Sequence, residues 1–255
     1  MEKGAIVGSI DVAQVVLYTF WVFFIGLIFY LRREDKREGY PLVSDRRGGV
    51  QVIGFPRPPS PKTFRLAHGG TAMAPNGKVD PPVTKARPTL PWPGAPLEPT
   101  GNPMLDGVGP AAYAQRADQP DLTVEGHDKI VPMRIAADFA IATEDPDVRG
   151  MSVIAADRKA AGIVHDVWVD RSEVVIRYLE IELTGGKRVL LPWNFSRVDK
   201  RRGRILVKSI LARQFADVPA TKSADRITLL EEDRIVAYYG GGHLYATASR
   251  AEPWL

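Results

Sequence analysis

Cysteine is absent from the 255 residues of this chain, and that absence excludes several classes of site at once. Without thiols there are no disulfides, thiolate metal centres, iron–sulfur clusters or covalently attached haems. The four histidines, at 68, 127, 165 and 243, are far apart, and none has the spacing of a His-Glu-x-x-His metal motif. The sequence also lacks a Walker loop and a Gly-x-Ser-x-Gly elbow. We expect no metal site and no catalytic residue set, although a dispersed Ser/His/Asp triad stays open.

Charge of either sign is not in large excess, because 34 basic and 30 acidic side chains leave a net charge of only +4. Proteins that bind nucleic acids usually carry a strongly basic face. We therefore expect no nucleic-acid partner.

Charged residues are missing from one long stretch near the N-terminus, residues 12–31 (VAQVVLYTFWVFFIGLIFYL). A helix rising about 1.5 Å per residue crosses the roughly 30 Å hydrocarbon core of a bilayer in about 20 residues. A cleaved signal peptide fits poorly, because no basic segment precedes the stretch and no small-residue cleavage site follows it. The stretch predicts one transmembrane helix. It contains no histidine or acid, so it offers no usual axial ligand for a chlorophyll or haem.

Basic residues flank this helix unevenly: Lys3 precedes it, and six lysines and arginines follow it before residue 48. Because Lys and Arg concentrate on the cytoplasmic side, we expect residues 1–11 to be periplasmic and the rest cytoplasmic. The residues expected at the lipid headgroups are Tyr30, Arg32, Arg33, Lys36 and Arg37. A stop-transfer role and specific binding of anionic lipids are both consistent with this cluster.

Proline is concentrated between residues 56 and 110, which hold 14 of the 21 prolines. Proline removes backbone donors and restricts φ, so long helices and central strands are not expected there. Residues 32–129 are therefore interpreted as an extended, Pro/Gly-rich surface segment. A flexible linker is the alternative, but exposed apolar residues such as Phe64 and Trp92 favour chain that lies on the surface of other subunits.

From residue 130 onward the pattern is that of short β-strands. Residues 162–170 and 173–183 are rich in β-branched and aromatic side chains, and a Thr-Gly-Gly-Lys turn at 184–187 leads into a further strand at 188–192. Short strands at 195–199 and 204–211 follow. These elements predict a small antiparallel barrel in residues 130–255, and hence a mainly β cytoplasmic domain.

A C-terminal helix is predicted after these strands. Thr228 and Glu231 have the spacing of a capping box, and LLEEDRIVAYY has helical periodicity. The glycines at 240–242 are expected to end this helix.

Ordered matches along nearly the whole chain resemble one family, the H subunit of purple-bacterial photosynthetic reaction centres. They include REGYPL (37–42), PTGNPMLDGVGPAAY (99–113), KIVPMR (129–134), DVWVD (166–170), YLEIEL (178–183) and ITLLEEDRIVAYYGGGHLYAT (227–247). The resemblance implies one membrane helix, an extended surface segment and a cytoplasmic barrel of the PRC type.

The resemblance also implies a function. Such a subunit binds no pigment and is not catalytic by itself; it caps the cytoplasmic face of the L and M subunits and carries protons toward the secondary quinone. Bacteriochlorophyll, bacteriopheophytin, quinones and non-haem iron are then expected in the partner subunits. The expected location is the bacterial inner, intracytoplasmic photosynthetic membrane, and an antenna ring and a cytochrome subunit are further candidate partners.

The positions that match the family's proton path are Asp170, Glu173 and Arg177, with His127 and Lys129 nearer the point of proton uptake. Glu173 precedes a strand, where a partly desolvated carboxylate is expected. Some members have two histidines around a glycine at the uptake point. This chain reads Glu125-Gly126-His127 there, so uptake through Glu125 is expected instead, and a two-histidine metal site is doubtful.

Two other classes of protein share the predicted architecture. One is a membrane-anchored enzyme with a cytoplasmic catalytic domain, and the other is a membrane-tethered adaptor with a PRC-like barrel. An isolated soluble fragment with activity favours the enzyme, whereas co-purification with bacteriochlorophyll and two further membrane polypeptides favours the reaction-centre subunit.

Overall fold

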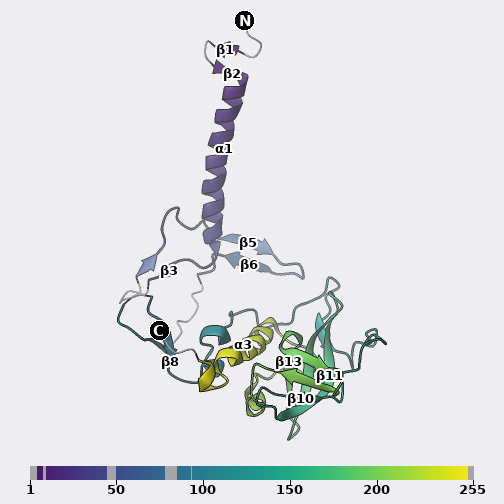
Figure 1. Ribbon diagram of the computed structural model, residues 1–255. Helices are drawn as coiled ribbons and strands as arrows, with labels where there is room; N and C mark the ends of the chain where they lie inside the picture. The colour runs from purple at the N-terminus through teal and green to yellow at the C-terminus, as the bar shows by residue number, and fades with distance from the viewer. Residues whose placement is uncertain (1–4, 8–9, 45–49, 78–84, 93, 252–255) are drawn as a thin grey trace. The chain divides into compact units, whose positions relative to one another are not determined.

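The computed structural model describes residues 5–7, 10–44, 50–77, 85–92 and 94–251 (Figure 1). The chain forms two compact units. The first consists of Met1–Pro81 with Leu90–Ala95, and the second consists of Pro82–Thr89 with Pro96–Leu255.

The first unit is built on the long helix α1 (Val12–Glu34), which follows the short strands β1 (Ala5–Val7) and β2 (Ile10–Asp11). Asp11 caps the helix, because its carboxylate accepts the backbone N–H of Gln14 at 2.8 Å. No residue of α1 is buried within the chain, and an 18-residue stretch of the span that begins at Val12 has a mean hydropathy of 2.2. Among the described residues α1 is the helix that is long and apolar enough to cross a membrane, as predicted.

After α1 the chain passes through the short 3-10 helix η1 (Asp35–Arg37) and forms two small antiparallel hairpins. They consist of β3 (Leu42–Val43) with β4 (Gln51–Val52), and β5 (Lys62–Arg65) with β6 (Thr71–Ala74). In this proline-rich part the described strands are two to four residues long, as expected where backbone donors are scarce.

Two basic side chains at the end of α1 hold these loops. Lys36 donates from Nζ to the carbonyl oxygens of Ile53 and Pro56 at 2.9 and 2.7 Å. Arg37 donates to the carbonyl oxygen of Ala74 at 3.0 Å, and it also pairs with Glu34 at 2.7 Å. Lys36 is only 3% exposed. Its ammonium group is therefore occupied by backbone carbonyls, and its place among lipid headgroups stays a prediction.

The second unit contains a seven-stranded sheet in the order β13-β12-β11-β10-β15-β14, with β9 also paired to β11. Its strands are β9 (Ile130–Pro132), β10 (Ser152–Ile154), β11 (Ala160–Asp170), β12 (Val175–Leu183), β13 (Arg188–Pro192), β14 (Ser196–Asp199) and β15 (Arg204–Val207). Strands β10 and β15 pair in parallel, and the other pairs are antiparallel. The two ends of the order, β13 and β14, are joined by η3 (Trp193–Phe195), so the sheet curls back on itself. The predicted small barrel is confirmed.

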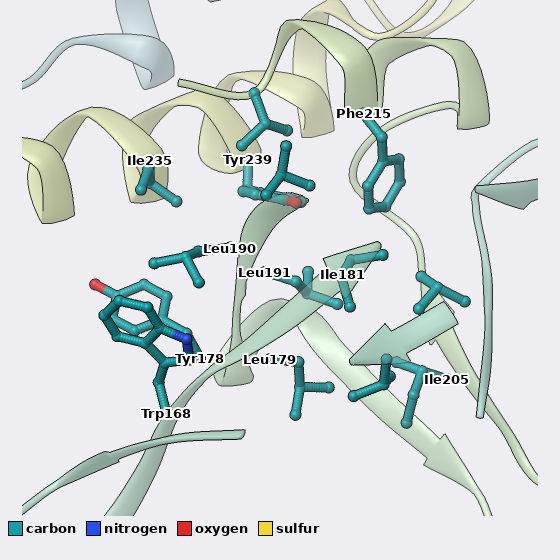
Figure 2. Close-up of a cluster of buried hydrophobic side chains, with 14 of the residues drawn as sticks. Trp168, Tyr178, Leu179, Ile181, Leu190, Leu191, Ile205, Phe215, Ile235 and Tyr239 are labelled. Atoms are coloured by element: carbon teal, nitrogen blue, oxygen red, sulfur yellow. The ribbon is translucent and has the colours of Figure 1, made fainter. Parts of the chain in front are cut away.

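The core of this unit lies between the sheet and the helix α3 (Leu229–Tyr245) (Figure 2). Leu179 and Leu191 come from neighbouring strands, while Ile235 and Tyr239 come from α3; all four are fully buried. The four residues 178–181 of β12 are all buried, so both faces of that strand are covered in its middle.

Helix α3 begins as predicted but ends later. The hydroxyl of Thr228 accepts the N–H of Glu231 at 3.2 Å, which confirms the capping box. The prediction that glycines 240–242 end the helix is wrong, because α3 continues to Tyr245. A methyl group on Gly241 would be 2.6 Å from Cβ of Ala111, and one on Gly242 would be 2.6 Å from the carbonyl oxygen of Ser209. These glycines allow α3 to pack closely against other chain segments.

Residues 96–129 are the last part of the segment 32–129 that is predicted to be extended surface chain, and they belong to the second compact unit. After the small hairpin β7 (Ala86–Pro88) and β8 (Leu97–Pro99) come the short helices α2 (Pro103–Asp106) and η2 (Gly109–Ala111), which pack on α3. The buried side chains there are Met104, Val108 and Ala111. Their apolar contacts with α3 explain why this stretch folds with the barrel. The remaining short 3-10 helices are η4 (Ala212–Asp217) and η5 (Ala248–Arg250).

Candidate proton-relay site

Lys129 is the centre of a cluster of three carboxylates. Its Nζ lies 3.6 Å from Oδ2 of Asp121, 3.6 Å from Oδ2 of Asp170 and 3.5 Å from Oε1 of Glu173. The sheet creates this arrangement, because β9 begins directly after Lys129 and its first residue, Ile130, pairs with Asp170 at the end of β11. Burial opposes the charge of the ammonium group, but the three carboxylates outweigh it and raise the pKa of Lys129.

Asp170 is the buried member of this cluster, with only 1% of its side chain exposed. Its Oδ1 accepts the backbone N–H groups of Ser172 and Glu173 at 2.9 and 3.0 Å. Its Oδ2 is buried and accepts no hydrogen bond within the described chain, so Lys129 at 3.6 Å is its nearest compensating charge. A buried oxygen with a free lone pair is a position that a proton or a water molecule can occupy.

Glu173 lies in the turn between β11 and β12, and its side chain is 58% exposed. The expected partial desolvation of this carboxylate is therefore not found within this chain. Only two residues separate it from the buried Asp170, and both carboxylates contact the same ammonium group. The pair thus links a buried carboxylate to an exposed one.

Arg177 belongs to a second group, which is centred on Glu232 of α3. The guanidinium lies 3.4 Å from Oε2 of Glu232, and the hydroxyl of Tyr178 donates to the same oxygen at 3.0 Å. Glu232 is 7% exposed, and burial raises its pKa despite these two partners. Burial opposes the charge of Arg177, but Glu232 raises its pKa and the negative charge of Asp170 adds a smaller contribution, so the two groups interact electrostatically.

His127 and Glu125 lie at the exposed tip of a loop whose base holds Asp121 and Lys129. The loop is closed by hydrogen bonds from Thr123 N–H to the His127 carbonyl at 2.8 Å and from Lys129 N–H to the Asp121 carbonyl at 2.9 Å. Hydrogen bonds from its own N–H and from the Thr123 hydroxyl lower the pKa of Glu125. Neither Glu125 nor His127 belongs to the ion pairs around Lys129. The loop therefore extends from the Lys129 cluster at its base to the solvent at its tip, and the tip side chains form no ion pair with Lys129.

A third set of buried charges provides a contrast. Arg134 lies 3.0 Å from Asp166 and 2.8 Å from Glu180, and the indole N–H of Trp168 donates to Glu180 at 2.9 Å. Both acids accept hydrogen bonds directly from the guanidinium of Arg134. In the Arg134 set each carboxylate accepts hydrogen bonds from fixed side chains, whereas Oδ2 of Asp170 accepts none within the described chain.

Sequence reasoning identified Asp170, Glu173, Arg177 and Lys129, but it missed Asp121 and Glu232. The sequence analysis placed Glu232 only within the predicted helical stretch LLEEDRIVAYY and gave it no role in the site. Three successive acids at 231–233 were a signal that one of them had to face inward. Of the expected headgroup residues, Tyr30, Arg32 and Arg33 are exposed, while Lys36 and Arg37 are engaged by the chain itself. Across the described ranges, no group of three His, Asp or Glu side chains has a metal-binding arrangement.

A single membrane-length helix followed by a small barrel that carries a carboxylate cluster defines a membrane-anchored PRC-barrel protein. The PRC-barrel domain family matches residues 142–214, which cover β10 to η4. The family described as the photosynthetic reaction centre H-chain N-terminal region matches residues 4–135, more than half of the chain. This chain therefore belongs to the photosynthetic reaction centre H-chain family.

Proposed function

We propose that this chain is the subunit that caps the cytoplasmic face of the pigment-binding L and M subunits and carries protons toward the secondary quinone. In this proposal it binds no pigment and has no catalytic activity of its own. The partners hold the bacteriochlorophyll, bacteriopheophytin, quinones and non-haem iron. The absence of histidine and acids from residues 12–31 supports this division of labour, because the span has no usual axial ligand.

The observation that carries the proposal is the Lys129 cluster, which joins a buried carboxylate to an exposed one. A doubly reduced quinone needs protons, and charge in a dry site is costly unless it is neutralised. A cap must exclude bulk water and still offer titratable groups at short intervals. We propose that protons are taken up near Glu125 and His127. They then pass Asp121 and Lys129 and reach Asp170 and Glu173. Arg177 and Glu232 set the electrostatic potential along this route.

The membrane placement is part of the same proposal. The helix α1 crosses the bacterial inner membrane with the N-terminus in the periplasm, and the barrel lies in the cytoplasm. Arg32 and Arg33, which are exposed at the end of α1, contact anionic headgroups. The coarser conclusion, a single-pass membrane protein of the reaction-centre H-chain family, follows from α1 and the family match together.

Glu173→Gln tests the relay, because it keeps the shape of the side chain and removes its ionisable proton. Complexes with this variant are expected to assemble and separate charge normally, and the proton-coupled transfer of the second electron to the quinone should slow by about tenfold or more. Flash-induced absorbance kinetics between pH 6 and 9 measure this rate.

Glu144→Gln is the matched control, because Glu144 is an exposed glutamate in the loop before Val148 and lies outside the Lys129 cluster. An unchanged second-electron rate in Glu173→Gln across the whole pH range would assign Glu173 a structural role and direct attention to Asp170 or Glu125.

A further inference from the structure

Residues 50–56 (VQVIGFP), which we call the 50–56 segment, carry no charge and return to the helix α1. The ring centroid of Phe55 lies 5.7 Å from that of Phe29, which is on α1. Phe29 belongs to the charge-free stretch 12–31 and is two residues before its end. At a rise of about 1.5 Å per residue, the contact lies about 3 Å inside the end of that stretch. Part of the chain that follows α1 is therefore level with the apolar span.

The apolar side chains of this segment are largely uncovered. Phe55 is 84% exposed although its ring lies beside α1, and Val52 and Ile53 are exposed too. Leu42, which is opposite Val52 in the β3–β4 hairpin, is likewise exposed. Directly opposite residues of a hairpin share one face of it, so the apolar surface extends from the segment to the neighbouring strand. Neighbouring apolar side chains that are exposed together indicate a surface that is covered when the protein works.

Lys36 satisfies the backbone on both sides of Phe55. Its Nζ donates to the carbonyl oxygens of Ile53 at 2.9 Å and Pro56 at 2.7 Å. Gly54, between them, has a φ of +65°, so the chain turns sharply in the left-handed region. In water these carbonyl groups would find solvent donors, whereas beside hydrocarbon an unpaired carbonyl is costly. A buried lysine that is bonded to the segment therefore suits a loop whose tip leaves the aqueous phase.

The surroundings of Phe55 indicate lipid as its cover. Phe29 is 44% exposed, and no residue of α1 is buried within the chain, so the helix face beside Phe55 is open to the bilayer. Arg57 follows the segment and is exposed. Aromatic side chains are enriched at the level of the headgroups, and a neighbouring arginine is attracted to anionic lipids. An uncharged tip followed by a cation thus matches the change in polarity across the surface of one leaflet.

We propose that the 50–56 segment inserts into the leaflet at the C-terminal end of α1 and is a second point of membrane attachment. Its backbone lies among the headgroups, and the side chain of Phe55 reaches the acyl chains. Lys36 holds the loop in this shape. A lone spanning helix is free to rotate about its axis, and a second anchor beside it fixes that rotation. The proposal rests on α1 crossing a membrane and is independent of the proton relay.

Spin labels on single cysteines test this placement, because the chain has no cysteine of its own. The full-length chain carrying Phe55→Cys is reconstituted into vesicles of phosphatidylcholine and phosphatidylglycerol. Its nitroxide should collide with oxygen, which dissolves in the acyl region. Collisions with a water-soluble nickel chelate should be at least about fivefold rarer than for a label in water, because hydrocarbon excludes water. Ile25→Cys, on the exposed surface of α1 within the stretch 12–31, is the lipid reference.

Met73→Cys is the aqueous control. Met73 is also an exposed apolar residue of the first unit, at 52%. Along β6 it alternates with Ala74, which is opposite Lys62, the residue that pairs with Glu34 of α1 at 2.9 Å. Its side chain therefore points away from the face that carries Lys62, and the nickel chelate should reach it freely.

Lys36→Gln in the Phe55→Cys chain should release the loop and raise its collisions with nickel by about threefold or more, because the carbonyl groups then need water. Arg33→Gln is the matched control. It removes a positive charge at the same end of α1, from an exposed side chain that has no hydrogen bond to the described segment. It should leave the collision rate unchanged.

Nickel access at Phe55→Cys that equals the access at Met73→Cys, with Ile25→Cys protected, would overturn the proposal and leave the membrane span intact. Nickel access at Ile25→Cys would mean that α1 does not span, and the proposal would fall with it. In native membranes, a Phe55→Cys label that neither reagent reaches would show that another polypeptide covers the segment, which also overturns lipid as the occupant. Equal effects of Lys36→Gln and Arg33→Gln would remove the role of Lys36.

Discussion

Asp170 and Glu232 are both buried carboxylates, but their charges are compensated differently. Asp170 receives two backbone N–H groups on one oxygen and has Lys129 3.6 Å from the other. Glu232 has one hydroxyl donor and a guanidinium at 3.4 Å, and burial still raises its pKa. Glu232 therefore retains a proton at a pH where an ordinary glutamate has lost it.

This difference predicts how stability depends on pH. Below the ordinary glutamate value of 4.5, Glu232 is protonated in both the folded and the unfolded chain. Above pH 4.5 the unfolded chain releases this proton, while Glu232 in the folded chain keeps it. The free energy of unfolding therefore falls as pH rises, until pH passes the raised pKa of Glu232. Relative to Glu232→Gln, the wild type should lose stability over this window.

Urea unfolding of the full chain in detergent micelles, followed at several pH values from 4 to 8, measures this loss. Asp233→Asn is the neighbouring control and should parallel the wild type. A difference between wild type and Glu232→Gln that does not vary with pH would show that Glu232 is not held in a desolvated site.

At the scale of elements, α3 shows that packing can override a local helix-ending signal. Glycine is unfavourable in a helix interior by about 1 kcal/mol relative to alanine, and three in a row normally indicate a terminus. Here α3 continues because its glycine surface lies against Ala111 and Ser209. The close packing and the buried apolar side chains along the helix stabilise the last turn.

Gly242→Ala is therefore expected to destabilise the chain, although alanine is the better helix former. A methyl group would be 2.6 Å from the Ser209 carbonyl oxygen, and overpacking of this kind costs about 1–3 kcal/mol. After the gain in helix propensity of about 1 kcal/mol, a net loss of up to about 2 kcal/mol is expected in urea unfolding.

Gly240→Ala is the graded control, because its methyl group would be 3.0 Å from the Pro110 carbonyl oxygen and should cost less. A stabilised Gly242→Ala would mean that α3 does not approach Ser209 this closely.

At the scale of the whole molecule, the proposed orientation can be tested directly because the chain has no cysteine. Single cysteines at Ser9 and Glu144 mark the two sides of α1. In intact spheroplasts a membrane-impermeant maleimide should label Ser9→Cys within minutes and should label Glu144→Cys only after permeabilisation. The excess of basic residues after α1 is the physical reason. The reverse labelling pattern would invert the topology and remove the proposed cytoplasmic relay.

The sequence by itself determined the features that depend on neighbouring residues. The uncharged run at 12–31, the strands around the Thr184–Lys187 turn and the Thr228–Glu231 capping box were all predictable, because hydropathy, strand propensity and capping act over a few residues. Family resemblance added Asp170, Glu173 and Lys129 as candidates, with no information on their contacts.

Tertiary structure alone decided what depends on residues far apart in the chain. Pairing of β9 with β11 brings Lys129 to Asp170, and packing of α3 on the sheet brings Glu232 to Arg177. The same packing makes glycines 240–242 helical, and Lys36 is buried because loops distant in sequence offer it two carbonyl groups. Burial and charge compensation are properties of such non-local contacts, so a local pattern cannot assign them.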